Sequence, residues 1–143
     1  MEKLYLDNCC FNRPYDDQTQ VKIHIETQAK LYIQEKILED KYALIWSYIL
    51  EYENFMNPYE TRRDSTLAWK SIASFHVVEN NEIISKANMI RGLGIKPQDA
   101  IHLASAIYAK ANYFITTDKG ILGKEIDEIE VLNPVDFIRI KEG

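Results

Sequence analysis

The sequence has no long hydrophobic run, and Met1-Glu-Lys-Leu-Tyr-Leu-Asp7 leads directly into a predicted strand. A membrane-spanning helix needs about 20 consecutive apolar residues, whereas the apolar runs here are only a few residues long. The first residues also contain no apolar region of the kind that a signal peptide has. The sequence therefore favours a cytoplasmic protein with no membrane partner.

Cysteine is scarce: only Cys9 and Cys10 are present, and they are adjacent. A disulfide between neighbouring residues would be strained. Neither cysteine has a second cysteine at the spacing of a zinc site. Free cysteines commonly behave as small hydrophobic side chains, so we expect both thiols to be free and buried.

Positive charge is also in short supply, with 17 Lys and Arg against 22 Asp and Glu, a net charge of -5. Proteins that coat nucleic acid through its phosphates need a basic surface, and this balance argues against that class. The sequence also lacks a Gly-rich phosphate-binding loop, which disfavours nucleoside-triphosphate chemistry. An enzyme whose carboxylates are neutralised by a metal ion remains compatible with the charge.

The chain has 143 residues, of which 46% are hydrophobic. This size suits one domain, residues 1–143, with a substantial core. Residues rich in β-branched and aromatic side chains predict strands near 3–6, 42–46, 75–79, 113–117 and 130–132, with helical periodicity between them. Alternation of strands and helices predicts a mostly parallel sheet covered by helices on both faces.

Two helical stretches carry apolar stripes. The first is predicted to begin after Asp16 and Asp17 and to run to about Glu39, with one stripe formed by Val21, Ile25, Ala29 and Tyr32. In the second, Ser47 is a suitable N-cap, and Asn57-Pro58 is expected to end the helix. Its aromatic stripe is interpreted as core packing and consists of Tyr48, Tyr52, Phe55 and Tyr59.

Three aspartates stand at the ends of predicted elements. Asp7 follows the first strand, Asp118 follows the strand near 113–117, and Asp99 lies in the first turn of an Ala-rich helix opened by Pro97. Each of them alone has an ordinary explanation as a turn or cap residue. Because sites in parallel α/β proteins form where strands end, the three carboxylates can instead converge on one pocket.

At four segments the sequence resembles the PIN-domain family of metal-dependent ribonucleases. The segments are Tyr5-Leu-Asp-Asn8, Ser47 through Glu53, Asp99-Ala-Ile-His-Leu-Ala-Ser-Ala, and Phe114-Ile-Thr-Thr-Asp118. The resemblance covers nearly the whole chain. It implies a PIN-like fold, a three-layer α/β/α sandwich with a mostly parallel sheet.

The resemblance also assigns the site residues. It implies that Asp7, Asp99 and Asp118 are three of four catalytic, metal-binding acids. The fourth is Glu53 or Glu51, which lie on different sides of one helix because two residues correspond to about 200° of rotation. We prefer Glu53, since the family usually places this Glu six residues after a Ser at the strand-to-helix turn, here Ser47.

The chemistry that the resemblance implies has a physical basis. Two carboxylates about 4 Å apart repel by roughly 4 kcal/mol at an effective dielectric constant near 20, so a cluster of acids requires cations. Hard oxygen ligands suit Mg²⁺ or Mn²⁺, which can activate water for attack on a phosphodiester. The family further implies an RNA substrate, an antitoxin protein as partner if the chain is a VapC-like toxin, and a homodimer.

Other readings stay open. A catalytically silent PIN-like module that binds nucleic acid or protein is the main alternative. A receiver-type domain with a phosphorylated Asp is disfavoured, because Asn8-Cys9 follows Asp7 instead of a second acid. His102 is interpreted as structural, although it lies one turn after Asp99. Basic side chains are candidates for phosphate contacts, with a solvated helix face as the alternative for the first three: Arg62, Arg63, Lys70, Lys119 and Lys124.

Overall fold

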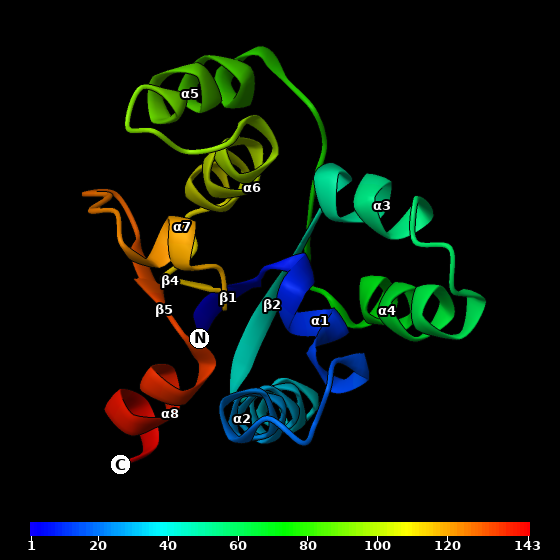
Figure 1. Cartoon of the computed structure of the whole chain (residues 1–143). Helices are drawn as coiled ribbons and strands as arrows, with labels where there is room; N and C mark the ends of the chain where they lie inside the picture. Colours follow the sequence, from blue (N-terminus) through cyan, green and yellow to red (C-terminus); the bar gives the residue numbers. More distant parts are fainter.

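A computed structural model describes all 143 residues and shows a five-stranded, entirely parallel sheet with the strand order β3-β2-β1-β4-β5 (Figure 1). The strands are β1 (Glu2–Leu6), β2 (Tyr42–Ser47), β3 (Phe75–Val77), β4 (Tyr113–Ile115) and β5 (Glu130–Leu132). The helices are α1 (Asn8–Asn12), the 3-10 helix η1 (Arg13–Tyr15), α2 (Val21–Leu38), α3 (Tyr48–Phe55), α4 (Glu60–Ile72), α5 (Asn81–Arg91), α6 (Pro97–Tyr108), α7 (Lys119–Leu122) and α8 (Pro134–Glu142).

Helices cover both faces of the sheet. In Figure 1, α5 and α6 lie on one side of the strands, and α2 and α8 lie on the other. Ring contacts agree with these layers: Tyr5 of β1 meets His102 of α6 edge-on, and Tyr42 of β2 meets Phe137 of α8. The predicted α/β/α sandwich with its parallel sheet is therefore confirmed.

The small side chains of α6 bring this helix close to the sheet. Ala100, Ala104 and Ala106 are all buried, as is Leu103 between them. A helix with alanines on its inner face can approach a sheet closely, because no long side chain separates the two backbones. Asp99 is thereby held at the N-terminal end of a rigid, well-packed element.

The order in which strands join the sheet switches sides at β1, between β1 and β4. After β1 the chain continues to β2 and β3, and it then crosses back to form β4 and β5 on the other side of β1. In parallel α/β sheets, such a switch point leaves a crevice beyond the carboxyl ends of the strands. Leu6 pairs with Ile115 at these ends, so the residues that follow both strands are neighbours.

Side-chain caps start the helices at this edge. Ser47 Oγ accepts a hydrogen bond from the Leu50 amide at 3.2 Å, as predicted for the start of α3. Asp7 accepts one from the Asn8 amide at 2.8 Å, and Asp118 accepts one from the Gly120 amide at 2.7 Å. These aspartates are thus cap residues and also members of the crevice.

The start of the first predicted helix was placed too early, directly after Asp16 and Asp17. Residues 8–15 form α1 and η1, and α2 begins only at Val21. Asp17 instead closes a turn, in which its carboxylate accepts hydrogen bonds from the Thr19 amide and hydroxyl at 3.0 and 2.7 Å. Local hydrogen bonding of Asp competes with helix formation, and here the turn prevails.

The orientation of α2 also differs from the prediction, because Val21 and Ile25 are exposed. The inner face of the helix instead carries Glu26, which forms an ion pair with Arg13 at 3.0 Å and accepts a hydrogen bond from Asn133. A buried charge is tolerated when it is paired in this way. Apolar periodicity alone does not reveal such a pair.

Most of the predicted aromatic stripe of α3 and the following turn is exposed. Tyr52, Phe55 and Tyr59 expose 52%, 76% and 57% of their surface, and Tyr48 is half-buried. The side of α3 that packs inward carries Ile49 and Leu50 instead. The interpretation as core packing was therefore wrong for Tyr52, Phe55 and Tyr59, whereas Tyr48 packs against the core as expected.

The cysteines are both free, as predicted. Cys10 is buried, whereas Cys9 is half-buried, so the expectation of burial was right for only one of them. No helix in the structure has the length and apolar character required to cross a bilayer.

Candidate functional site

The four acids predicted from the resemblance line one pocket of about 500 Å³. The pocket opens at the carboxyl edge of the sheet, where β1 and β4 end, and it is bordered by the C-terminal half of α3 and the N-terminal end of α6. Asp7, Glu53, Asp99 and Asp118 come from four separate elements of the chain. The fold therefore brings all four predicted residues together.

Asp7 is the most rigidly held of the four. It is buried, and its Oδ2 accepts a hydrogen bond of 2.8 Å from Thr116 Oγ1 while its Oδ1 accepts one from the Asn8 amide. The Cys9 thiol lies 3.5 Å from the same Oδ2. Three partners from two strand ends thus set the orientation of this carboxylate.

Glu53 is held by a buried chain of polar side chains. Its Oε1 accepts a hydrogen bond of 2.8 Å from Nε2 of His102. The other ring nitrogen, Nδ1, lies 2.6 Å from the Tyr5 hydroxyl, which lies 2.6 Å from Ser47 Oγ. Tyr5, Ser47 and His102 are completely buried, so this chain connects the sheet core to the pocket.

The sequence had predicted only that His102 is structural. The structure shows that it connects Tyr5 to Glu53. Burial by itself lowers the pKa of His102, but the hydrogen bond to Glu53 and the charges of Asp7, Glu53 and Asp99 outweigh burial and raise that pKa. Its Nε2 also lies 3.9 Å from Asp7 Oδ1. The imidazole thus donates a hydrogen bond to Glu53 and also lies beside Asp7.

Glu51 lies outside the pocket. It pairs with Lys70 at 2.7 Å and accepts a hydrogen bond from the Trp46 indole at 3.2 Å. The hydrogen bond from Lys70 lowers the pKa of Glu51. Of the two glutamates that the sequence left open, only Glu53 borders the pocket.

Asp99 is the acid least satisfied by its surroundings. Burial, together with the negative charges of Asp7 and Asp118, raises the pKa of Asp99 to about 6. No hydrogen bond to its carboxylate is present within the chain, although it lies in the first turn of α6, where the helix dipole favours negative charge. Its two oxygens remain available to a ligand.

Asp118 and Asp7 are connected through Thr116. The hydroxyl of Thr116 donates to Asp7 and accepts a hydrogen bond of 3.0 Å from the Asp118 amide. The Oδ1 of Asp118 caps α7 at Gly120, and its Oδ2 makes no hydrogen bond. Thr116 thus links two acids of the pocket.

No Lys or Arg lies within 4 Å of any of these four carboxylates, and His102 is their only basic partner. The structure shows no group of three or more His, Cys, Asp or Glu side chains in an arrangement that would hold a metal ion. The oxygen-only donor set and the raised pKa of Asp99 nevertheless fit a hard divalent cation. Such a cation would relieve the mutual repulsion of the acids.

Several lining residues had no functional assignment from the sequence. Cys9 borders the pocket, and its sulfur accepts a hydrogen bond from the Thr117 amide at 3.4 Å. Tyr52, Met56 and Gln98 also line it. Their position becomes visible only when α3, α6 and the end of β1 are assembled.

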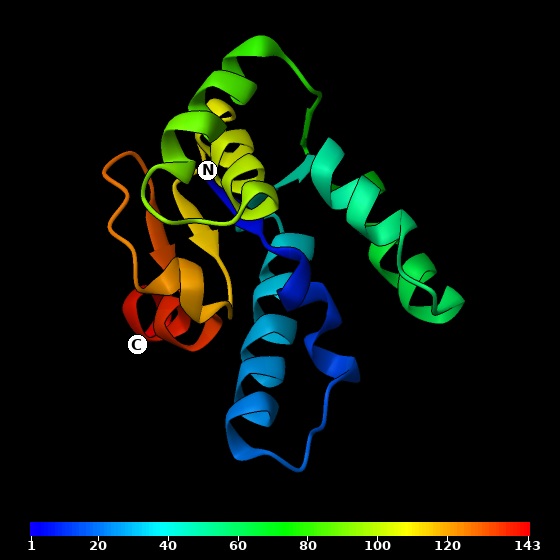
Figure 2. The same ribbon diagram turned by 45° about the horizontal axis from the view of Figure 1, so that its top comes forward.

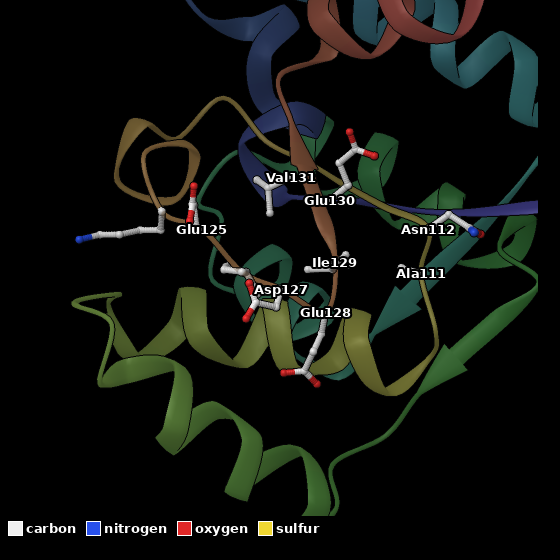
Figure 3. A pocket seen from close by; sticks show the side chains of 10 residues that line it. Ala111, Asn112, Glu125, Asp127, Glu128, Ile129, Glu130 and Val131 are labelled. Atoms are coloured by element: carbon white, nitrogen blue, oxygen red, sulfur yellow. The ribbon is translucent and has the colours of Figure 1, made fainter.

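A larger hollow, of about 610 Å³, lies along the segment between α7 and β5 (Figure 3). Figure 3 shows the side chains of Glu125, Asp127, Glu128 and Glu130 pointing in different directions. Glu128 forms an ion pair with Lys86 at 2.8 Å. This hollow is acidic, but its carboxylates do not converge.

Comparison with known proteins supports the fold. The sequence matches no known family profile and no curated protein. The structure is similar to a chain in VapBC2 from Rickettsia felis bound to a DNA fragment from their promoter, with a TM-score of 0.59 and 15% identity, covering 92% of this chain and 98% of that one. It is also similar to a chain in VapBC-5 from Mycobacterium tuberculosis, a member of the VapBC family of toxin-antitoxin systems, with a TM-score of 0.54 and 15% identity, covering 93% and 99%. The likeness confirms the PIN-like fold that the resemblance predicted.

Proposed function

We propose that this chain is a metal-dependent endoribonuclease and the toxin of a type II toxin-antitoxin pair. The observation that carries the proposal is the convergence of Asp7, Glu53, Asp99 and Asp118 in one pocket without any Lys or Arg partner. The pocket stands at the switch point of a parallel sheet, where sites of α/β proteins commonly form. Residues 1–143 act as a single domain in this proposal.

The four acids would hold Mg²⁺ or Mn²⁺ through their carboxylate oxygens. When bound, such an ion supplies an activated water nucleophile and stabilises the leaving oxygen of a phosphodiester. The donor set suits these ions because the four proposed ligands are carboxylates, with no thiolate or imidazole among them.

The side chains around the pocket orient the acids. Thr116 and the Asn8 amide fix Asp7, and His102 holds one oxygen of Glu53 while the other oxygen makes no hydrogen bond within the chain. These carboxylates are expected to bind a metal ion without changing their rotamers, because their hydrogen-bond partners already set their orientation. Asp99 keeps both oxygens free and completes the negative lining of the pocket.

The choice of substrate and partner rests on the resemblance and on the structural neighbours. Both neighbours come from VapBC proteins, and VapBC-5 is described as a toxin-antitoxin system. We therefore propose RNA as substrate, an antitoxin protein as partner, a homodimer as assembly, and the cytoplasm as the place of action. A basic tail of the antitoxin would reach Asp7 and Asp99 through charge-assisted hydrogen bonds.

The central experiment measures cleavage of a labelled RNA by the purified chain with Mg²⁺, Mn²⁺ or EDTA. We expect metal-dependent cleavage that leaves 5′-phosphate and 3′-hydroxyl ends. A thermal melt in the same buffers should show a higher Tm with metal, because a ligand of the folded state stabilises it. If millimolar metal produces neither cleavage nor a change in Tm, the proposed enzyme activity is overturned, and the catalytically silent PIN-like module is favoured.

The toxin assignment has its own test. Co-expression with the product of the adjacent small gene should yield a complex that co-purifies, and it should abolish growth inhibition caused by this chain alone. Asp7→Asn should be harmless without the partner. A wild-type chain that neither slows growth nor binds the neighbouring gene product would remove the toxin role while leaving the nuclease test untouched.

A further inference from the structure

An exposed aromatic surface adjoins the acid pocket. It consists of Tyr15, Tyr52, Met56, Tyr59 and Arg62, and we refer to it as the aromatic surface. Tyr52, Met56 and Tyr59 each expose more than half of their surface. Large apolar side chains that cluster in the open near a site mark a surface that binds something.

The two ends of the aromatic surface are built differently. At one end, Tyr52 and Met56 of α3 border the same pocket as Asp7 and Asp99. At the other end, Tyr59 begins the first turn of α4, three residues after Met56. One end of the surface therefore lines the acid pocket, and the other end follows it within a few residues of the chain.

An arginine packs on two tyrosine rings at the far end. The guanidinium carbon of Arg62 is 4.1 Å from the ring centre of Tyr59 and 5.0 Å from that of Tyr15. Arg62 forms no ion pair, unlike Lys70 on the same helix, which is bound to Glu51. Its charge is stacked on aromatic faces but is not neutralised.

Hydrogen bonds hold the turn that carries Tyr59. The Tyr59 amide donates to Asn57 Oδ1 at 3.0 Å, and the Asn57 side-chain amide donates to Asn12 Oδ1 at 3.2 Å. Arg63 also donates to the Asn57 carbonyl at 2.9 Å. Figures 1 and 2 show α1, which begins just after Asp7, beside α3 and α4. The aromatic surface and the pocket are thus parts of one connected framework.

Exposed tyrosine rings together with a free arginine have the chemistry that binds unpaired nucleobases. Bases stack on tyrosine rings, and a cation beside the rings can contact the phosphates. Bases within a duplex are stacked on one another and present no free face to a side chain. A strand that passes from the pocket over Tyr52 and Tyr59 would have to be single.

We infer that Tyr52, Tyr59 and Arg62 form a stacking site for unpaired bases flanking the phosphodiester that lies in the acid pocket. This inference rests on the proposed nuclease function and specifies how its substrate is held. The three residues are positioning residues, since none of them reaches the reacting atoms. The occupant is a single strand of RNA, because stacking rings next to an acidic, metal-type pocket match a strand with bases on one side and phosphates on the other.

The test measures RNA binding by fluorescence anisotropy, with the chain in EDTA so that no cleavage occurs. The probes are a labelled single strand of about 12 nucleotides, its abasic counterpart and its duplex, in about 50 mM salt. We expect the single strand to bind more tightly than either control. The double variant Y52A/Y59A should lose about 25-fold or more of its affinity for the single strand, since each stacked base contributes a factor of about 5 or more.

Matched variants separate stacking from other effects. Y52F/Y59F keeps both rings and should stay within about threefold of the wild-type affinity. Tyr108→Ala removes a tyrosine of similar exposure at the C-terminal end of α6, opposite to the end that carries Asp99. This variant should bind the single strand as tightly as the wild type. All these variants should melt like the wild type, because the altered side chains lie at the surface.

Several outcomes would overturn the inference. It fails when Y52A/Y59A binds the single strand as tightly as the wild type, when the abasic strand binds equally well, or when Tyr108→Ala loses as much. It also fails when Y52A/Y59A dissociates a homodimer in sedimentation while RNA affinity is unchanged, since the surface would then be an interface between copies.

The two proposals fail separately. Metal-dependent cleavage by the wild type without any effect of the aromatic variants on binding would remove the stacking site and keep the nuclease. Base-dependent binding that requires Tyr52 and Tyr59, without cleavage in any metal, would keep the stacking site and remove the nuclease.

Discussion

Two regions of this protein are rich in carboxylates, and only one of them has the geometry of a site. In the acid pocket, Asp7, Glu53 and Asp99 come from separate elements and meet where parallel strands end. In the segment between α7 and β5, Glu125 and Glu128 lie on one stretch of chain and point apart (Figure 3). The difference shows that acidic composition alone does not identify a site.

Their electrostatic surroundings differ as well. The pocket acids have no Lys or Arg neighbour, and burial raises the pKa of Asp99 to about 6. Glu128 is half exposed and is paired with Lys86 at 2.8 Å. Repulsion among carboxylates is strong where burial prevents screening by solvent. It is weak where water surrounds the charges or a lysine pairs with them.

The largest expected difference in cleavage is between a variant that removes one charge from the acid pocket and a variant that removes one from the segment between α7 and β5. Asp99→Asn should reduce metal-dependent RNA cleavage by more than about 100-fold, beyond what substitutions outside the ligand set cost. Glu128→Gln should leave cleavage unchanged and should alter the free energy of unfolding by at most about 1 kcal/mol, since its ion pair is exposed. Cleavage rates and chemical denaturation of both variants test this contrast.

Asp99→Asn should also melt at the same temperature as the wild type or slightly higher in EDTA, because like-charge repulsion is relieved. Full activity of this variant would show that the converging acids are not the site. Equal losses in both variants would erase the distinction between the two regions.

The next effect separates the two glutamates of α3. Glu53→Gln should lose cleavage by about 100-fold, as expected for a group in the ligand set of a metal site. Glu51→Gln should keep its activity and change the free energy of unfolding by about 0.5 kcal/mol or less. The reverse result would move the second acid to Glu51, which pairs with Lys70 outside the pocket.

A smaller effect is expected behind the pocket. Tyr5→Phe removes the hydroxyl that joins Ser47 to His102, and it should lower the free energy of unfolding by about 1–3 kcal/mol because buried partners lose a hydrogen bond. Tyr108→Phe, at an exposed position, is the control and should be neutral. Urea denaturation measures both, and equal stability of the two variants would show that the buried chain contributes nothing.

The smallest effect is a pH dependence of metal-free stability. The pKa of Asp99 rises from 3.8 to about 6 on folding, so the folded state binds this proton more tightly than the unfolded state does. Stability is therefore greatest when Asp99 is protonated, and it is lost as the pH rises between these two values. The raised pKa of His102 acts in the same direction.

Thermal melts in EDTA between about pH 4 and pH 7 test this behaviour. The Tm of the wild type should fall with rising pH more steeply than that of Asp99→Asn, and Glu128→Gln should follow the wild type. Parallel curves for wild type and Asp99→Asn would contradict the raised pKa.

Much of the fold was predictable because strands and helices here leave strong local patterns. The strands near 3–6, 42–46 and 130–132 and the N-cap Ser47 agree with the structure. The turn at Asp17 escaped prediction because its side chain competes with the helix through local hydrogen bonds. The short helices α1, η1 and α7 are too brief to show a full apolar period.

The candidate site divides in the same way. Asp7, Asp99 and Asp118 were placed from their positions at element ends, and their convergence follows from the parallel order of the strands. The choice between Glu51 and Glu53 depended on which face of α3 turns toward α6. Helical rotation is known from the sequence, but the direction that counts as inward is not.

The sequence by itself determined the parallel sheet, the helices between its strands and the order of the acids, since these follow from local patterns and spacing. Only the tertiary structure decided that His102 joins Tyr5 to Glu53 and that Tyr52 and Tyr59 lie in the open. Both depend on which surfaces of separate elements meet, and burial is a property of the assembled elements. An aromatic stripe has the same periodicity whether it packs inward or faces the solvent.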